Sequence, residues 1–266
     1  MHAHRKIAVA GATGRVGRHV AHILKAGGHD VVAISRSSGV DVVTGESLAA
    51  ALDGVECVID AATGPSPEQQ AATTFFTAAA RNLQQAGERA GVRRIVVVSI
   101  IGCDRFGGGY GAAKIAHEDA MRSGSIPVGI LRAAQFHEFV AQLVDWGRQG
   151  EVSFVPEMRT QLVAASTVAQ ALADLALATD PDWARAAAAG SGPAAPPIPE
   201  IAGPREENLI AMAKLLVART GDPVRIEGVR DPSDPDSAVY ISGALLPNPH
   251  ATLGGPTFEE WLDATT

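Results

Sequence analysis

The stretch that most constrains the fold is residues 7–20, which read IAVAGATGRVGRHV. Its first four residues are small or apolar and predict a strand buried on both faces, and a helical pattern begins before the stretch ends. Three glycines, Gly11, Gly14 and Gly17, lie between them at a spacing of three. Gly11 allows a sharp turn, Gly14 lets backbone N–H groups approach a phosphate, and Gly17 lets the helix pack closely on the sheet. This order is typical of a dinucleotide-binding turn.

The chain up to Gly150 continues to alternate strand and helix patterns joined by short links. Such alternation predicts βαβ units and therefore a parallel sheet with helices on both faces. Two weaker patterns predict a short third strand at Asp41–Val43 and a short helix at Glu46–Leu52. The clearer strands are expected at Val31–Ser35, Glu56–Ala62, Arg94–Ser99 and Val128–Leu131, and the clearer helices at Ser66–Ala90, Tyr110–Ser123 and Phe136–Arg148.

The pattern loosens beyond Gly150. We expect a flexible loop over Asp180–Gly203, which is rich in Pro, Ala and Gly and leads to a short edge strand near Ile198–Ala202. Further helices are expected at Ser166–Ala178, Glu206–Thr220 and Phe258–Leu262, and a second loop at Arg230–Ser237. The predicted fold class is α/β: a Rossmann-type doubly wound parallel sheet forming one domain over residues 1–266, with about 181–266 contributing most of a small C-terminal substrate lobe.

Composition excludes several classes of partner. The chain has 266 residues, a net charge of −7 and no basic cluster, which argues against nucleic acid or an anionic membrane surface. Its two cysteines make neither a disulfide framework nor a metal site. No apolar run reaches membrane-spanning length, and no signal-peptide pattern precedes the first strand. We expect a cytoplasmic protein, a monomer or small homo-oligomer, whose partner is a small-molecule substrate.

The end of the second predicted strand bears on the choice of cofactor. In this architecture it faces the adenosine ribose, where an acidic residue favours NAD and an arginine accommodates the 2′-phosphate of NADP. Arg36 follows that strand, so NADP(H) is expected, with NAD(H) less favoured. The expected cofactor-binding residues are Gly11, Ala12, Thr13, Gly14, Arg15, Val16, Gly17, Arg36, Ala61, Ala62, Thr63 and Lys114.

Tyr110 and Lys114 are the residues best suited to chemistry. Their spacing places both side chains on one face of a helix. An ammonium near a phenol lowers the phenol pKa, which suits proton donation to a carbonyl oxygen while hydride arrives from the cofactor. Ser99, at the end of the preceding strand, is placed to hydrogen-bond the same oxygen.

These motifs resemble the short-chain dehydrogenase/reductase superfamily, and more closely its atypical, NmrA-like branch of NAD(P)-binding proteins. The resemblance implies that Tyr110 is the acid/base, Lys114 its partner and Ser99 the orienting hydroxyl. That branch also includes proteins that bind the cofactor as redox sensors without turnover. The resemblance rests on Gly11-x-x-Gly14-x-x-Gly17, Ser99-x-x-Gly102 and Tyr110-x-x-x-Lys114, and on the segments RIVVVSIIGCDR, YGAAKIAHEDAM and VGILRAAQFHEFV.

Ligands of open α/β sheets bind beyond the carboxyl ends of the strands. Gln135, Phe136 and His137 follow such an end and are expected to contact substrate. His117 and Glu118 are expected to face solvent, with Glu118 paired to Lys114.

The predicted function is an NADPH-dependent reductase of a small carbonyl, quinone or related acceptor. Two alternatives stay open at this point, a non-catalytic NADP(H) sensor and a cofactor-retaining isomerase or epimerase.

Overall fold

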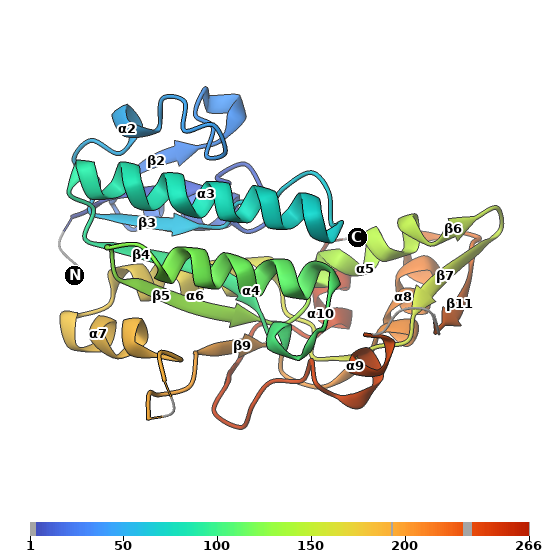
Figure 1. Cartoon of the computed structure of the whole chain (residues 1–266). Coiled ribbons are helices and arrows are strands. Elements are labelled where there is room, and N and C mark those ends of the chain that lie inside the picture. Colours follow the sequence, from blue (N-terminus) through green and yellow to red (C-terminus); the bar gives the residue numbers. More distant parts are fainter. Residues whose placement is uncertain (1–3, 193, 231–235, 266) are drawn as a thin grey trace.

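The computed structural model describes residues 4–192, 194–230 and 236–265. Its centre is a seven-stranded sheet in the order β12-β9-β5-β4-β3-β1-β2, in which every neighbouring pair is parallel (Figure 1). The predicted Rossmann-type fold is therefore confirmed. The strands are β1 Lys6–Ala10, β2 Asp30–Ile34, β3 Cys57–Asp60, β4 Arg94–Ile100, β5 Val128–Ala133, β9 Glu200–Ala202 and β12 Thr252–Leu253.

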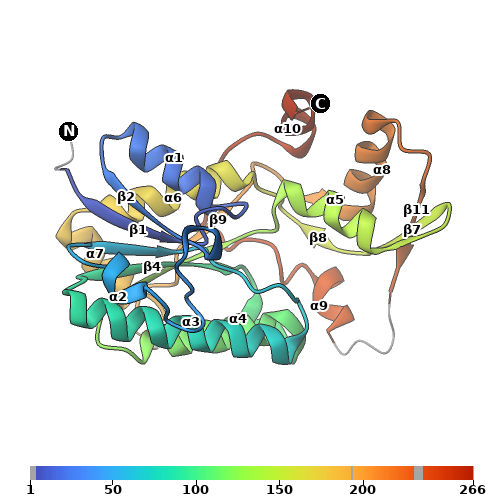
Figure 2. The ribbon, with the colours of Figure 1, turned by 90° about the horizontal axis from the view of Figure 1, so that it is seen from above.

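Helices cover both faces of this sheet. Figure 2 shows α1 (Gly17–Ala26) and α6 (Ala165–Leu177) on one face, and α3 (Gln69–Ala90) and α4 (Gly109–Arg122) on the other. The short helix α2 (Leu48–Ala51) lies on the side of α3. Strand alternation explains the two layers, since Ile7 and Val9 of β1 pack into one core while Ala8 and Ala10 pack into the other.

A smaller body, which we call the lobe, is built from segments that follow β5, β9 and β12. Its core contains Val140, Val155, Leu209, Ile226 and Phe258. It comprises α5 His137–Trp146, β6 Arg148–Gln149, β7 Val152–Pro156, β8 Arg159–Thr160, β10 Glu207–Asn208, α8 Leu209–Thr220, β11 Arg225–Val229, α9 Ser237–Ser242 and α10 Phe258–Thr265.

The expected flexible loop over Asp180–Gly203 is wrong in its first part. Residues Asp180–Ala188 form helix α7, which has a proline in its first turn and packs on β5. Trp183 holds it there, because its ring fills the space above Gly129 that a side chain would occupy. Helix α7 thus packs on the main sheet rather than on the lobe.

Two expected strands also differ. Asp41–Val43 forms a turn instead of a strand, and β2 is an edge strand of the seven-stranded sheet. The Asn82 amide of α3 donates to the carbonyls of Val42 and Val43 and fixes that turn. The strand near Ile198–Ala202 is present as β9, but it lies between β5 and β12 instead of at the edge.

Of the loop expected at Arg230–Ser237, residues 231–235 lie outside the described residues. No helix within the described ranges is long and apolar enough to cross a membrane.

Candidate functional site

The glycine turn lies against the carboxyl ends of β1, β2 and β3. Gly11 has φ +73°, and its N–H donates to the carbonyl of Ile34 at 2.9 Å. A Cβ on Gly11 would lie 2.6 Å from the carbonyl oxygen of Ala61. The turn therefore packs backbone to backbone on the end of β3, which only glycine permits.

The turn leaves backbone donors open for a ligand. Gly14 donates to the Gly11 carbonyl, whereas the N–H groups of Thr13, Arg15 and Val16 have no hydrogen-bond acceptor within the described part of the chain. These donors precede the first turn of α1, where the helix dipole adds partial positive charge. The turn fits the pyrophosphate of a dinucleotide.

Two arginines border this turn. Arg36 is exposed at the start of a single 3₁₀ turn after β2, held by a capping box of Ser35 and Ser38. Arg15 is half-buried and donates to Gln142 of α5 at 3.1 Å. The structure thus leaves Arg36 accessible beside the sheet end, and ties Arg15 to the lobe.

Residues Ala61, Ala62 and Thr63 form the strand-end turn that follows β3. The turn is held by Asp60, whose Oδ1 accepts the Ala62 N–H at 3.0 Å. Small side chains here leave the backbone open on the same edge of the sheet as the glycine turn. That Ala61, Ala62 and Thr63 contact the cofactor stays a prediction.

Tyr110 reaches this strand-end turn from the first turn of α4. Its hydroxyl lies 3.1 Å from Thr63 Oγ1. Burial raises the pKa of the phenol, and the hydrogen bond with Thr63 only partly opposes this rise. The expectation that Lys114 lowers the pKa of this phenol is wrong in this structure, since the ammonium is held elsewhere.

Lys114 is buried and points into a polar interior. Its Nζ lies 2.8 Å from the Val98 carbonyl and 2.9 Å from His117 Nδ1, over the ring of Phe76. Burial lowers the pKa of Lys114 to about 8, against the opposing influence of Asp60 and Glu118. This amine titrates close to physiological pH.

His117 is buried as well, so the expectation that it faces solvent is wrong. Its Nε2 lies 3.0 Å from Asp60 Oδ2, and its ring stacks on Phe76 at 4.6 Å between centroids. Burial and the Lys114 charge lower the pKa of this imidazole. We call Asp60, His117 and Lys114 the buried polar chain.

Glu118 is also buried, and its partner is Arg132 of β5 rather than Lys114. The two side chains form a bidentate pair with both N–O distances at 3.0 Å. Cys103 donates its thiol hydrogen to the same carboxylate, and Ser99 lies 3.8 Å from the Cys103 sulfur. The Ser99 hydroxyl, fully enclosed within β4, therefore takes part in this cluster.

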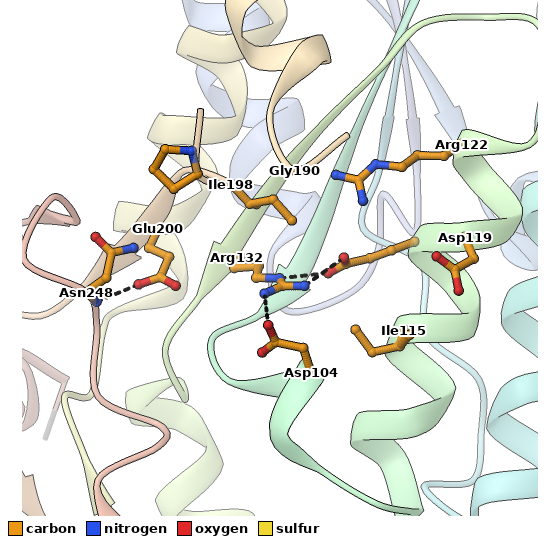
Figure 3. A pocket seen from close by; sticks show the side chains of 11 residues that line it. Asp104, Ile115, Asp119, Arg122, Arg132, Gly190, Ile198, Glu200 and Asn248 are labelled. Atoms are coloured by element: carbon orange, nitrogen blue, oxygen red, sulfur yellow. Dashed lines mark hydrogen bonds and ion pairs between the residues drawn. The ribbon is translucent and has the colours of Figure 1, made fainter. Parts of the chain in front are cut away.

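A pocket of about 420 Å³ lies beside the Glu118–Arg132 pair, between α4 and β9 (Figure 3). Figure 3 shows the guanidinium of Arg132 also joined to Asp104, at 3.1 Å. Arg122, Ile198 and Glu200 complete the walls. The pocket shares no lining residue with the glycine turn or the strand-end turn, and the Arg132 guanidinium in its wall is paired with Glu118 and Asp104.

The three expected substrate contacts lie at the start of the lobe. Gln135 accepts a hydrogen bond from the Thr160 hydroxyl, and Phe136 is half-buried. His137 is fully buried, with Nε2 on the Pro256 carbonyl and its ring against Phe258. The structure places Gln135 and Phe136 at the junction of sheet and lobe and encloses His137 behind them.

Sequence reasoning missed Asp60 and misjudged His117. Two signals were present: an acidic residue ends the otherwise apolar strand β3, and a histidine follows Lys114 by three residues on one helix face. A group of three or more His, Cys, Asp or Glu side chains arranged for a metal ion is absent from the described ranges.

A family model described as NAD(P)H-binding matches residues 11–178. No curated protein sequence matches the chain. Among solved structures, a short-chain dehydrogenase/reductase superfamily protein from Agrobacterium tumefaciens with bound NAD gives a TM-score of 0.64 at 17% identity, covering 97% of this chain and 95% of that one. The NAD-dependent NDP-hexosamine 5,6-dehydratase TunA gives 0.66 at 16% identity, covering 98% and 96%. A UDP-galactose 4-epimerase gives 0.61 at 18% identity, covering 84% and 85%. At these identities the likeness is one of fold.

Proposed function

Because the chain belongs to the NAD(P)H-binding family, we propose that it is an NADPH-dependent reductase of a small carbonyl, quinone or related acceptor. The observation that carries the proposal is the position of the Tyr110 hydroxyl. It lies 3.1 Å from Thr63 Oγ1, on the sheet edge that also bears the glycine turn. A proton donor is thereby held at the edge where a dinucleotide would bind.

In this proposal each group has a defined task. The open N–H groups of the glycine turn bind the pyrophosphate, and Arg36 binds the 2′-phosphate. The reduced nicotinamide supplies a hydride when bound. Tyr110 donates a proton to the acceptor oxygen, and its raised pKa keeps it in the acid form at neutral pH. Lys114 supplies positive charge from the buried polar chain behind the strand-end turn, and Gln135 and Phe136 border the substrate.

A second candidate is an NADP(H) sensor of the NmrA-like type that does not turn over. The position of Ser99 favours it, because this hydroxyl is enclosed with Cys103. The set of Ser, Tyr and Lys side chains is thus not gathered around one oxygen.

The test is a screen of NADPH oxidation across ketones, aldehydes, imines and quinones, paired with direct measurement of NADPH affinity. Substrate-dependent oxidation supports the reductase. Tight binding without oxidation of any acceptor supports the sensor, and product formation without net change in NADPH indicates an isomerase or epimerase.

A further inference from the structure

The buried polar chain is unusual because three ionisable side chains are enclosed together. Asp60 and His117 are each 1% exposed and Lys114 is 5% exposed. Removing a charge from water is costly unless the charge is paired and hydrogen-bonded. Each member here has such a partner, so the arrangement is consistent with a specific role for the charge that it holds.

The direction of the hydrogen bonds follows from the donors available. A lysine ammonium has only donors, so His117 Nδ1 must accept from Lys114. The proton of the neutral imidazole is then on Nε2, which donates to Asp60 Oδ2. The lowered pKa of His117 agrees with a neutral ring. The neutral His117 ring thus hydrogen-bonds both the negative carboxylate of Asp60 and the positive ammonium of Lys114.

Asp60 also reaches the cofactor edge directly. Its second oxygen, Oδ1, accepts the N–H of Ala62 in the strand-end turn. A single carboxylate therefore holds both the backbone on which a ribose would lie and, through His117, the buried amine behind it.

We propose that Asp60 and His117 are positioning residues that keep Lys114 charged, and that cofactor binding is coupled to protonation of Lys114 through them. The inference rests on the proposed function in one respect, that a dinucleotide occupies this edge of the sheet. It extends that function in two ways: cofactor affinity depends on pH, and Asp60 and His117 are the residues that produce this dependence.

The charged and titratable surroundings of Lys114 come from several elements. Asp60 and Glu118 favour its charged form, and burial opposes it. The Cys103 thiol stays neutral, since burial raises its pKa to about 11. The groups packed around the amine are Asp60 of β3, the Val98 carbonyl of β4, His117 and Glu118 of α4, Cys103, and the uncharged ring of Phe76 from α3.

The cofactor is an anion, so the charged lysine binds it better than the neutral one does. Affinity is then expected to be highest below the Lys114 pKa of about 8 and to fall as pH rises through it. Close to that pH, binding takes up a proton from the buffer onto Lys114 Nζ.

The experiment measures NADPH and NADH affinity by fluorescence titration across this pH range. NADH is included because it lacks the 2′-phosphate of NADPH. The second ionisation of that phosphate lies near pH 6 and would itself make NADPH affinity depend on pH. Asp60→Asn is expected to move the alkaline fall in affinity to lower pH by about one pH unit, the low end of the effect of a nearby opposite charge. His117→Leu is expected to do the same, and His117→Gln, which keeps an acceptor, to move it less.

Two control variants test whether Lys114 is the group that titrates and whether the effect is specific to the cofactor edge. Lys114→Met should remove the alkaline fall. His29→Gln alters another buried histidine, which accepts from the Arg5 N–H away from the cofactor edge, and should leave the fall in place. Circular dichroism and thermal unfolding establish that each variant is folded. Calorimetry of the wild-type protein in two buffers of different ionisation enthalpy measures proton uptake without any variant.

Failure of the inference and failure of the proposed function are distinguishable. If the wild type binds neither cofactor at any pH, both the proposed cofactor site and the proposed coupling are overturned. If the wild type binds but takes up no proton near pH 8, or if folded Asp60→Asn and His117→Leu bind with the wild-type pH midpoint, only the coupling is overturned.

Discussion

A Cβ placed on Gly17 would lie 2.1 Å from the carbonyl oxygen of Gly11. Because Gly17 has no Cβ, the first turn of α1 can lie directly against the backbone that follows β1. Gly17→Ala forces the helix and the turn apart, so the open N–H groups no longer converge. We expect a loss of stability of about 1–3 kcal/mol, the usual range for overpacking, together with at least roughly tenfold weaker cofactor binding. Gly192→Ala, at a site with open space around it, is the matched control in denaturant unfolding and cofactor titration. Equal behaviour of the two variants would contradict the role given to this contact.

Arg36 is expected to select NADPH over NADH. Arg36→Ala removes a guanidinium that can bind the 2′-phosphate through two hydrogen bonds, and hydrogen bonds to charged groups are worth about 1.5–3 kcal/mol. NADPH affinity should therefore fall roughly ten- to hundredfold, while NADH affinity changes little. Titration of both cofactors against the wild type, Arg36→Ala and Lys25→Ala checks this, since Lys25 is an exposed cation on α1. The prediction is wrong if the wild type binds both cofactors equally.

Tyr110→Phe is expected to separate chemistry from binding. Removal of the hydroxyl should lower turnover by roughly 10²–10⁴-fold, the worth of a positioned acid, and leave NADPH affinity nearly unchanged. The control is Tyr240→Phe in α9, which alters the other tyrosine of the chain. The measurement uses an acceptor found by the oxidation screen. Wild-type turnover by Tyr110→Phe would mean that another group or water donates the proton.

Glu118 is expected to stabilise the fold in a pH-dependent way. Burial alone would raise its pKa, but the hydrogen bonds from Arg132 and Ser99 outweigh burial and lower it below the ordinary value of 4.5. A lowered folded-state pKa means that the stabilisation is fully present above the unfolded-state value and is lost as pH falls towards the folded-state one. Glu118→Gln should cost about 3 kcal/mol near neutral pH, the low end for breaking a buried ion pair, because Asp104 still contacts Arg132.

Urea unfolding of the wild type and Glu118→Gln at several pH values checks this dependence. The difference between the two proteins should shrink as pH falls below about 4.5, where the wild-type carboxylate begins to be protonated in the unfolded chain. A difference that stays constant down to acid pH would show that the variant disturbs packing rather than charge.

The sequence predicted those features that depend on local pattern. The glycine turn and the βαβ alternation are local, and β1 to β5 appear within a few residues of their expected bounds. Composition misled the prediction at α7, where an Ala-rich segment looked like a loop. The missing information was tertiary: Trp183 packs over Gly129, a contact that no local pattern shows.

The candidate site also contains features that local pattern predicts and features that depend on tertiary contacts. The position of Tyr110 at the start of a helix follows from its spacing to Lys114, whereas its contact with Thr63 does not. The partner of Lys114 does not, because His117 is enclosed by Phe76 of α3 and hydrogen-bonds Asp60, which is 57 residues away in the sequence. Solvent exposure of a helix face depends on what packs against it, and α3 covers this face of α4.

The bond between Arg15 of the glycine turn and Gln142 of α5 joins residues that are 127 positions apart. The chain leaves the sheet after β5 to build part of the lobe, returns through β9, leaves again, and returns through β12. Sheet and lobe are thus connected by several covalent crossings instead of one hinge. Limited proteolysis at a single site is therefore not expected to yield two independently folded halves, since each fragment would lack strands or core residues that only the other supplies.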